Sequence, residues 1–210
     1  MRLLVGLGNP GAAYANNRHN VGFMALDAIA KRYGFSAWRK RFQGVIAEGL
    51  VEGEKALAFK PAAYINLSGQ CVGEAVRFFK IAPEDVIVIY DEIELTPGKV
   101  RVKRGGGSAG HNGIKSIDAH VGVDYWRVRL GIGRPAGAGD VSNHVLQNFT
   151  KADMDWLGPF LDAVAASVPL LVTGDDNKFM TKVAMLTAPP TPKNQKSTDG
   201  EVPSEPTESE

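Results

Sequence analysis

The chain has 210 residues, of which 44% are hydrophobic, and a net charge of +1, so it is long enough to bury the core of one full domain. Its single cysteine, Cys71, excludes an internal disulfide framework and is typical of a reducing compartment. Few apolar residues follow Met1-Arg2, and polar residues and prolines interrupt the apolar stretch at 160–172. We therefore expect neither a signal peptide nor a membrane span, and a cytoplasmic location.

Residues 187–210 differ in composition from the rest of the chain. They hold two lysines against five acids, a balance of −3, which leaves +4 on the body. They also contain five prolines, and Val202 is the single aliphatic side chain after Ala188. We expect a folded domain over residues 1–186 and a disordered tail over residues 187–210. The mildly basic body favours an anionic partner.

Strand and helix patterns alternate along the body. The predicted strands cover residues 3–5, 45–50, 55–59, 86–90, 99–103 and 126–132. The predicted helices cover residues 21–33, 151–172 and 176–186, with two more through Val72 to Phe79 and through Ile114 and Ile117. This alternation predicts an α/β fold, a single domain with a mixed, mostly parallel, twisted sheet flanked by helices.

Three local features accompany these elements. Asn20 directly precedes the first helix and is expected to cap it. Residues 38–42 interleave aromatic and basic side chains, and we interpret them as a solvated loop or an edge strand rather than a nucleic-acid contact. In the alternating strand at 99–103, the three cations Lys99, Arg101 and Lys103 share one face.

Polar residues follow two of the predicted strands. The loop at 6–20 contains His19, and Asp91 ends the strand at 86–90. Because the carboxyl ends of parallel strands lie at one sheet edge, we expect these two side chains to meet. A carboxylate beside an imidazole fixes its tautomer and stabilises the imidazolium, which is typical of a general base. The spacing of the four histidines predicts no metal site.

Two motifs suggest other chemistry. Gly6 to Gly11 matches the dinucleotide-binding pattern G-x-G-x-x-G, but the next helix begins too late and the expected acidic residue is missing. Gly106 to Gly110 matches the G-x-S-x-G elbow of serine hydrolases around Ser108, but a long glycine run does not suit one sharp turn. With Lys103 and Arg104 before it, the same loop fits a phosphate cradle or a flexible hairpin equally well.

Taken together, these pieces resemble bacterial-type peptidyl-tRNA hydrolase. Five motifs carry the resemblance in the family's order: GLGNPGxxYxxxRHNxGF at the start, KPxxYxNxSG at 60–69, Asp91-Glu92, GGGSAGHNG, and RVRLGIGRP at 127–135. The resemblance implies hydrolysis of the ester between tRNA and a peptide or N-blocked amino acid, which recycles tRNA from prematurely released peptidyl-tRNA. Residues 1–186 would then be the catalytic domain, acting as a monomer without a metal or an organic cofactor.

The resemblance also implies a role for each matching residue. His19 would activate water, and Asp91 would keep His19 basic. Asn9 would sense the acylated amino group and carbonyl of the substrate. The amides of Asn66 and Asn112 would hold the ester region and the tRNA 3′ end. Tyr14 and Tyr64 would provide contact surfaces. The cations Lys103 and Arg129 would bind the 5′ phosphate.

The chain departs from the family pattern at a few positions. Ala63 and Ile65 stand where threonine and methionine are usual, and Ala109 replaces a frequent glycine. The loop at 136–139 lacks a basic residue, and residues 140–150 with the next helix look like the family's mobile cover over the cleft. Two rival functions remain: an RNA-binding module without catalysis, and a serine esterase at Ser108.

Overall fold

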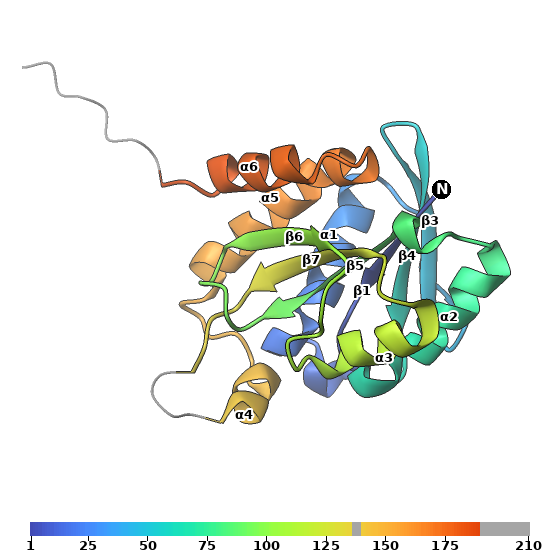
Figure 1. Ribbon diagram of the computed structural model, residues 1–210. Coiled ribbons are helices and arrows are strands. Elements are labelled where there is room, and N and C mark those ends of the chain that lie inside the picture. Colours follow the sequence, from blue (N-terminus) through green and yellow to red (C-terminus); the bar gives the residue numbers. More distant parts are fainter. Residues whose placement is uncertain (136–139, 190–210) are drawn as a thin grey trace, which may run out of the picture.

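The computed structural model describes residues 1–135 and 140–189. Within them, one sheet has the strand order β2-β3-β4-β1-β5-β7-β6 (Figure 1). Its strands are β1 (Arg2–Gly6), β2 (Arg39–Arg41), β3 (Gly44–Val51), β4 (Glu54–Pro61), β5 (Val86–Glu92), β6 (Val100–Arg104) and β7 (Trp126–Gly131). Each predicted strand lies in this sheet, and the consecutive strands β3 and β4 form an antiparallel hairpin.

Parallel pairing is confined to the middle of the sheet. Strands β4, β1, β5 and β7 are parallel neighbours, whereas β2 with β3, β3 with β4, and β7 with β6 pair in antiparallel fashion. Most strands therefore run in one direction, with antiparallel pairs at the two ends of the sheet. The predicted α/β fold with a mixed sheet flanked by helices is confirmed.

Helices cover both faces of the sheet (Figure 1). They are α1 (Val21–Arg32), α2 (Ser68–Phe79), α3 (Asn112–Val121), α4 (Val141–Leu146), α5 (Met154–Val172) and α6 (Asp176–Leu186). Helices α1, α5 and α6 bury one core against the sheet, and α2 and α3 bury a second core on the opposite face. Short 3-10 turns η1 (Ala12–Tyr14), η2 (Arg18–Asn20), η3 (Ile65–Leu67) and η4 (Pro83–Asp85) connect them.

A close contact between α1 and the sheet positions the loop before it. A Cβ atom on Gly22 would lie 2.3 Å from the carbonyl oxygen of Ile89 and 2.7 Å from the backbone nitrogen of Leu7. Only a glycine allows the first turn of α1 to lie this near to β1 and β5. This contact holds η2, which directly precedes α1, beside the carboxyl end of β5.

Two local predictions need correction or refinement. Asn20 occupies the N-cap position of α1, but its side chain makes no capping bond and binds the backbone of Asn9 instead. Residues 39–41 form the edge strand β2, as one of the two interpretations held, while Phe42 is buried against Phe59 and Phe79.

Helix α5 is long and apolar enough to cross a membrane by length and composition alone, with a mean hydropathy of 1.3. Half of that window is buried inside the domain, where α5 packs on α1 and α6 as a core helix does. The predicted tail begins directly after α6, and its residues 190–210 lie outside the described residues, as does the loop at 136–139.

Candidate active site

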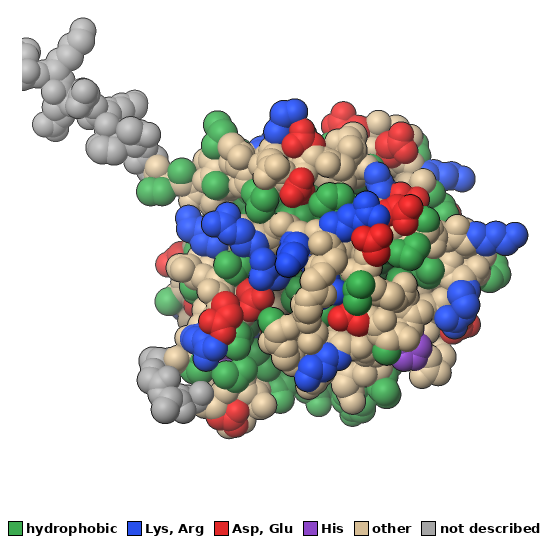
Figure 2. All heavy atoms as spheres, viewed as in Figure 1, with side chains coloured by type: hydrophobic (Ala, Val, Ile, Leu, Met, Phe, Trp, Pro, Cys, Tyr) green, Lys and Arg blue, Asp and Glu red, His purple; other side chains and the backbone are tan. Residues whose placement is uncertain are grey.

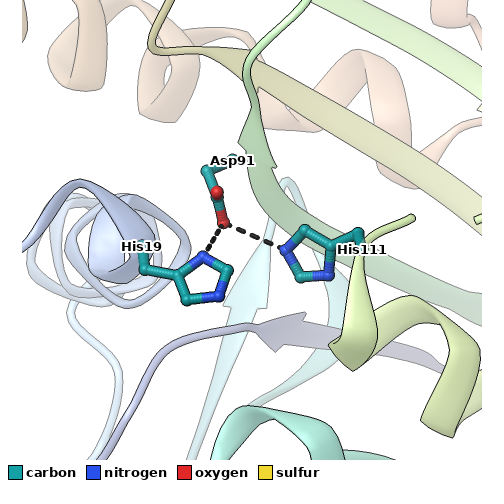
Figure 3. Close-up of side chains that lie close together, drawn as sticks. All are labelled: His19, Asp91 and His111. Carbon is teal, nitrogen blue, oxygen red and sulfur yellow. Dashed lines mark hydrogen bonds and ion pairs between the residues drawn. The ribbon is translucent and has the colours of Figure 1, made fainter. Parts of the chain in front are cut away.

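Three side chains from separate elements meet at the carboxyl edge of the sheet (Figure 3). His19 comes from η2, Asp91 from the end of β5, and His111 from the residue before α3. The Nδ1 atom of His19 lies 2.8 Å from Asp91 Oδ1, and the Nε2 atom of His111 lies 3.0 Å from the same oxygen. The predicted meeting of His19 with Asp91 occurs, and His111 joins it.

Hydrogen-bond partners assign the tautomers of both imidazoles. His111 Nδ1 accepts the backbone N–H of Ile114 at 3.3 Å, so the ring proton sits on Nε2 and is donated to Asp91. His19 donates its Nδ1 proton to Asp91, which leaves the lone pair on Nε2. That Nε2 points away from Asp91 and has no hydrogen-bond partner among residues 1–135 and 140–189 (Figure 3). His19 is therefore oriented as a base.

The electrostatics of the pair favour ionised Asp91 and basic His19. Burial by itself would raise the pKa of Asp91, but the charges of His19 and His111 and their hydrogen bonds together lower it far below its usual value. Burial would lower the pKa of His19, but the charge of Asp91 and the hydrogen bond to it together raise that pKa above the usual value. Asp91 thus strengthens the base that it orients.

The distances among these three residues would admit a metal ion, since their ligand atoms all lie within 4.8 Å of one another. The tautomer of His111 opposes such a site. A metal on Nε2 would move the proton to Nδ1, where it would face the N–H of Ile114. The residues thus suit a hydrogen-bonded cluster better than a metal centre.

A cavity of about 230 Å³ opens over the cluster. Its walls come from η2, the end of β5, the glycine-rich loop with the start of α3, and α4. Helix α4 contributes Val141, Ser142 and Val145, so the segment expected to cover the cleft does line it. Asn112, at the first turn of α3, lines the cavity as well and is exposed.

Asn9 does not line this cavity but a separate pocket that it shares with Asn20, and its neighbours hold it there. Its backbone N–H and C=O both bind the side chain of Asn20, at 3.0 and 2.9 Å. Its side-chain Oδ1 accepts the backbone N–H of Ile65 at 3.0 Å. The remaining polar group of Asn9 is the Nδ2 donor. The departure at Ile65 leaves this contact intact, because the contact uses the backbone.

The other predicted binding residues lie outside the walls of that cavity. Asn66 in η3 is exposed, and Tyr64 directly before η3 is 61% exposed. Tyr14 is half-buried at the end of η1. Tyr64 and Asn66 flank Ile65, whose backbone N–H binds Asn9, so these two residues lie near Asn9.

Four cations share one face of the β6–β7 ribbon, and we call them the basic face. On β6, Lys103 pairs in register with Arg127 of β7, and Arg101 pairs with Arg129. Figure 2 shows Lys and Arg side chains gathered over this part of the molecule. The predicted clamp residues Lys103 and Arg129 are therefore diagonal neighbours. Alternation of side chains along β6 places Lys103 and Arg101 on one face as predicted, and both are exposed.

Arg127 stabilises the glycine-rich loop at 105–110 through a hydrogen bond to its backbone. It is buried, and it donates to the Gly107 carbonyl and to Asp118, both at 2.8 Å. Asp118 also accepts the hydroxyl of Tyr125 at 2.8 Å. This buried network ties the loop and α3 to β7, and thereby supports His111.

The alternative motifs gain no support. Helix α1 begins at Val21, well beyond Gly11, and the 3-10 turns η1 and η2 lie between them, so the N-terminus of α1 does not directly follow the G-x-G-x-x-G loop. Ser108 lines the cavity, but both ring nitrogens of His111 are engaged, by Asp91 and Ile114, and within residues 1–135 and 140–189 no hydrogen bond joins the Ser108 hydroxyl to a histidine ring. His111 also occupies one of the free N–H groups that a phosphate cradle at α3 would use.

From the sequence, His111 is assigned no role, whereas the structure places it in the cluster with Asp91. Its position offered a signal, because it ends a loop that follows a strand and it directly precedes a helix, as catalytic residues of α/β folds do. The ion pair between Glu92 and Arg129, at 3.6 Å, was also not foreseen.

Comparison with known proteins identifies the family. The family profile described as peptidyl-tRNA hydrolase matches residues 3–194. The chain belongs to the peptidyl-tRNA hydrolase family. It is thus a hydrolase of the class that acts on the ester bond of peptidyl-tRNA.

Relatives and solved structures agree with this family. The chain is 58% identical to the peptidyl-tRNA hydrolase of Rhodospirillum centenum over 190 residues, which cover 90% of this chain and 84% of that one. It is 61% identical to the enzyme of Chelativorans sp. over 185 residues, 88% of this chain and 77% of that one. The crystal structure of peptidyl-tRNA hydrolase from Acinetobacter baumannii has a TM-score of 0.81 and 37% identity, covering 87% of this chain and 94% of that one.

Proposed function

We propose that this hydrolase releases tRNA from prematurely terminated peptidyl-tRNA in the cytoplasm, using water activated by His19. The observation that carries the mechanism is the His19–Asp91 pair at 2.8 Å, with the second ring nitrogen of His19 free to accept a proton. The residues of the site supply a base and hydrogen-bond donors, so the mechanism uses no cofactor. We expect the monomer to be the active form.

The reaction begins with a water molecule held at Nε2 of His19. His19 takes a proton from this water as the oxygen attacks the ester carbonyl, and Asp91 stabilises the resulting imidazolium. The tetrahedral intermediate then expels the ribose oxygen of the tRNA, which takes the proton back from His19. His111 donates a second hydrogen bond to Asp91 and keeps this carboxylate ionised and in place.

Asn9 supplies selectivity in this mechanism. Because Ile65 occupies its Oδ1, Asn9 offers only its Nδ2 donor to the substrate. A peptide or N-blocked amino acid presents a carbonyl oxygen that can accept this donor. A free aminoacyl-tRNA presents an ammonium group, which is itself a donor and leaves Asn9 unpaired.

The remaining residues bind the RNA. The exposed amides of Asn66 and Asn112 are available for the ester region and the 3′ end, and Tyr64 and Tyr14 offer ring surfaces to the terminal bases. Lys103 and Arg129 on the basic face attract the 5′ phosphate. Sequence-tolerant contacts of this kind suit an enzyme that accepts many tRNAs.

Release of amino acid from N-acetylaminoacyl-tRNA, beside the unblocked aminoacyl-tRNA, tests this function. We expect the protein to cleave the blocked substrate only. If neither substrate were cleaved while tRNA still bound, the chain would be an RNA-binding module rather than an enzyme. Full activity of Ser108→Ala would exclude the serine esterase.

Asn9→Asp tests the selectivity, because it replaces the Nδ2 donor with an acceptor of the same shape. We expect kcat/KM for the blocked substrate to fall about tenfold or more, in line with loss of one donor at a reacting centre, and the ratio between blocked and unblocked substrates to narrow. An unchanged ratio would show that Asn9 does not read the blocking group. Asn177→Asp, at an exposed amide on α6 and outside the walls of the cavity, is the matched control.

A further inference from the structure

The basic face concentrates positive charge on one strand pair. Its residues lie directly opposite one another, Lys103 against Arg127 and Arg101 against Arg129, and like charges in this position destabilise a sheet. Acids compensate the two β7 residues only: Arg127 pairs with Asp118 at 2.8 Å and Arg129 with Glu92 at 3.6 Å. Lys103 and Arg101 have no ion pair within residues 1–135 and 140–189.

Glu92 is the unusual member of these pairs, because it also belongs to the catalytic cavity. It is the last residue of β5, its side chain is 7% exposed, and it forms part of the cavity wall beside Asp91. Its Oε1 accepts the backbone N–H of Glu94 at 3.1 Å, and its Oε2 faces Arg129. A carboxylate this deeply buried requires a cation. Arg129 is the cation that the described residues provide within 4.0 Å.

Arg129 is only partly committed to this pair. The 3.6 Å separation from Glu92 exceeds a hydrogen bond, so the two groups attract one another without sharing a proton. The Nε of Arg129 is buried and has no partner among the described residues. About a third of the Arg129 side chain is exposed, and its guanidinium has unused donors, so it can bind another anion. The negative charge of Glu92 still reduces the net positive charge of the basic face when such an anion binds.

We infer that Glu92 limits how tightly the basic face holds the phosphate of RNA, so that the deacylated tRNA leaves after the reaction. This inference rests on the proposed function. Hydrolysis changes the acyl end of the substrate and leaves its phosphates unaltered, so phosphate contacts bind substrate and product alike. Stronger contacts of this kind lower KM but slow product release, and do not accelerate the chemical step. Glu92 weakens these contacts from a position inside the cavity wall.

Glu92→Gln in the full chain tests the inference, since glutamine keeps the acceptor for Glu94 and removes the charge. At low salt we expect deacylated tRNA to bind about three- to tenfold more tightly, as for one added phosphate-binding charge. We also expect kcat in steady state to fall by a larger factor than the rate of single-turnover cleavage. The affinity difference should shrink at high salt. Glu94→Gln is the matched control, because Glu94 is exposed and pairs with Arg134 on the adjacent turn; it should change affinity less than twofold.

Further variants separate charge from packing. In an Arg129→Gln background, Glu92→Gln should no longer tighten binding, and Glu92→Asp, which keeps the charge, should bind tRNA as the wild type does. Glu92→Met provides a second neutral side chain if Glu92→Gln folds poorly. If the neutral variants bound tRNA with the same affinity as the wild type, or if Glu92→Asp bound it more tightly, the inference would be wrong. The proposed function would not be affected by either result. Failure of the wild type to bind tRNA would overturn the proposed function together with the inference.

Discussion

The catalytic cluster and the basic face use charged residues in opposite ways. In the cluster, one buried carboxylate accepts hydrogen bonds from two imidazoles, and a single ring nitrogen of His19 remains free. On the basic face, like charges stand opposite one another and the β6 cations are exposed. A reacting group gains from a fixed position and a shifted pKa, whereas an anion-binding group gains from charge that stays available. Chemistry and affinity should therefore respond to separate mutations.

The largest expected effect is on chemistry. His19→Ala removes the base and should lower kcat by about 10³-fold, within the range for general-base catalysis, while the Kd for tRNA stays within twofold of wild type. Single-turnover cleavage and equilibrium binding measure the two quantities. The control is His120→Ala, at an exposed histidine whose ring binds the Ser116 carbonyl of its own helix. Near-normal turnover of His19→Ala would refute the mechanism.

The second expected effect is on stability. Arg127→Met leaves Asp118 and the Gly107 carbonyl without their buried partner and should lower the free energy of unfolding by about 3 kcal/mol, as for other broken buried pairs. Urea denaturation measures the loss. Arg104→Met is the matched control, since its pair with Asp124 is exposed and should contribute below about 1 kcal/mol. Equal losses would show that burial of Arg127 does not matter.

The smallest expected effect is on affinity. Lys103→Ala should weaken tRNA binding by about three- to tenfold, reduce the salt dependence of binding by about one phosphate contact, and leave kcat unchanged. Titrations of tRNA at several salt concentrations measure both values. Lys31→Ala, at an exposed lysine in the last turn of α1, serves as the control. A loss of kcat in Lys103→Ala would contradict the separation between the two regions.

Much of the fold follows from the sequence because periodicity and burial agree. The continuous apolar run at 86–90 became a strand buried on both faces, and the alternating residues at 99–103 became β6 with an exposed basic side. The meeting of His19 with Asp91 followed from their positions at strand ends. These predictions use the pattern of neighbouring residues and the position of a residue at the end of a strand, and both can be determined from the sequence.

What could not be predicted depends on contacts between distant segments. Asn20 has the right residue type and position for an N-cap, but the backbone of Asn9 competes successfully for its side chain. The contact of His111 with Asp91 joins the residue before α3 to the end of β5, and the spacing of the histidines along the chain does not reveal it. The Glu92–Arg129 pair likewise joins two strands whose adjacency emerges only in the folded sheet.

The pH dependence of kcat/KM, for wild type and Asp91→Asn, tests the central claim that Asp91 raises the basicity of His19. The base must be neutral to act, so activity should rise with pH through the pKa of His19, and the wild-type midpoint should lie above the usual value of about 6.5. Without the charge of Asp91, burial of His19 dominates, and the midpoint should move below that value while the plateau falls. An unchanged midpoint in Asp91→Asn would contradict the account.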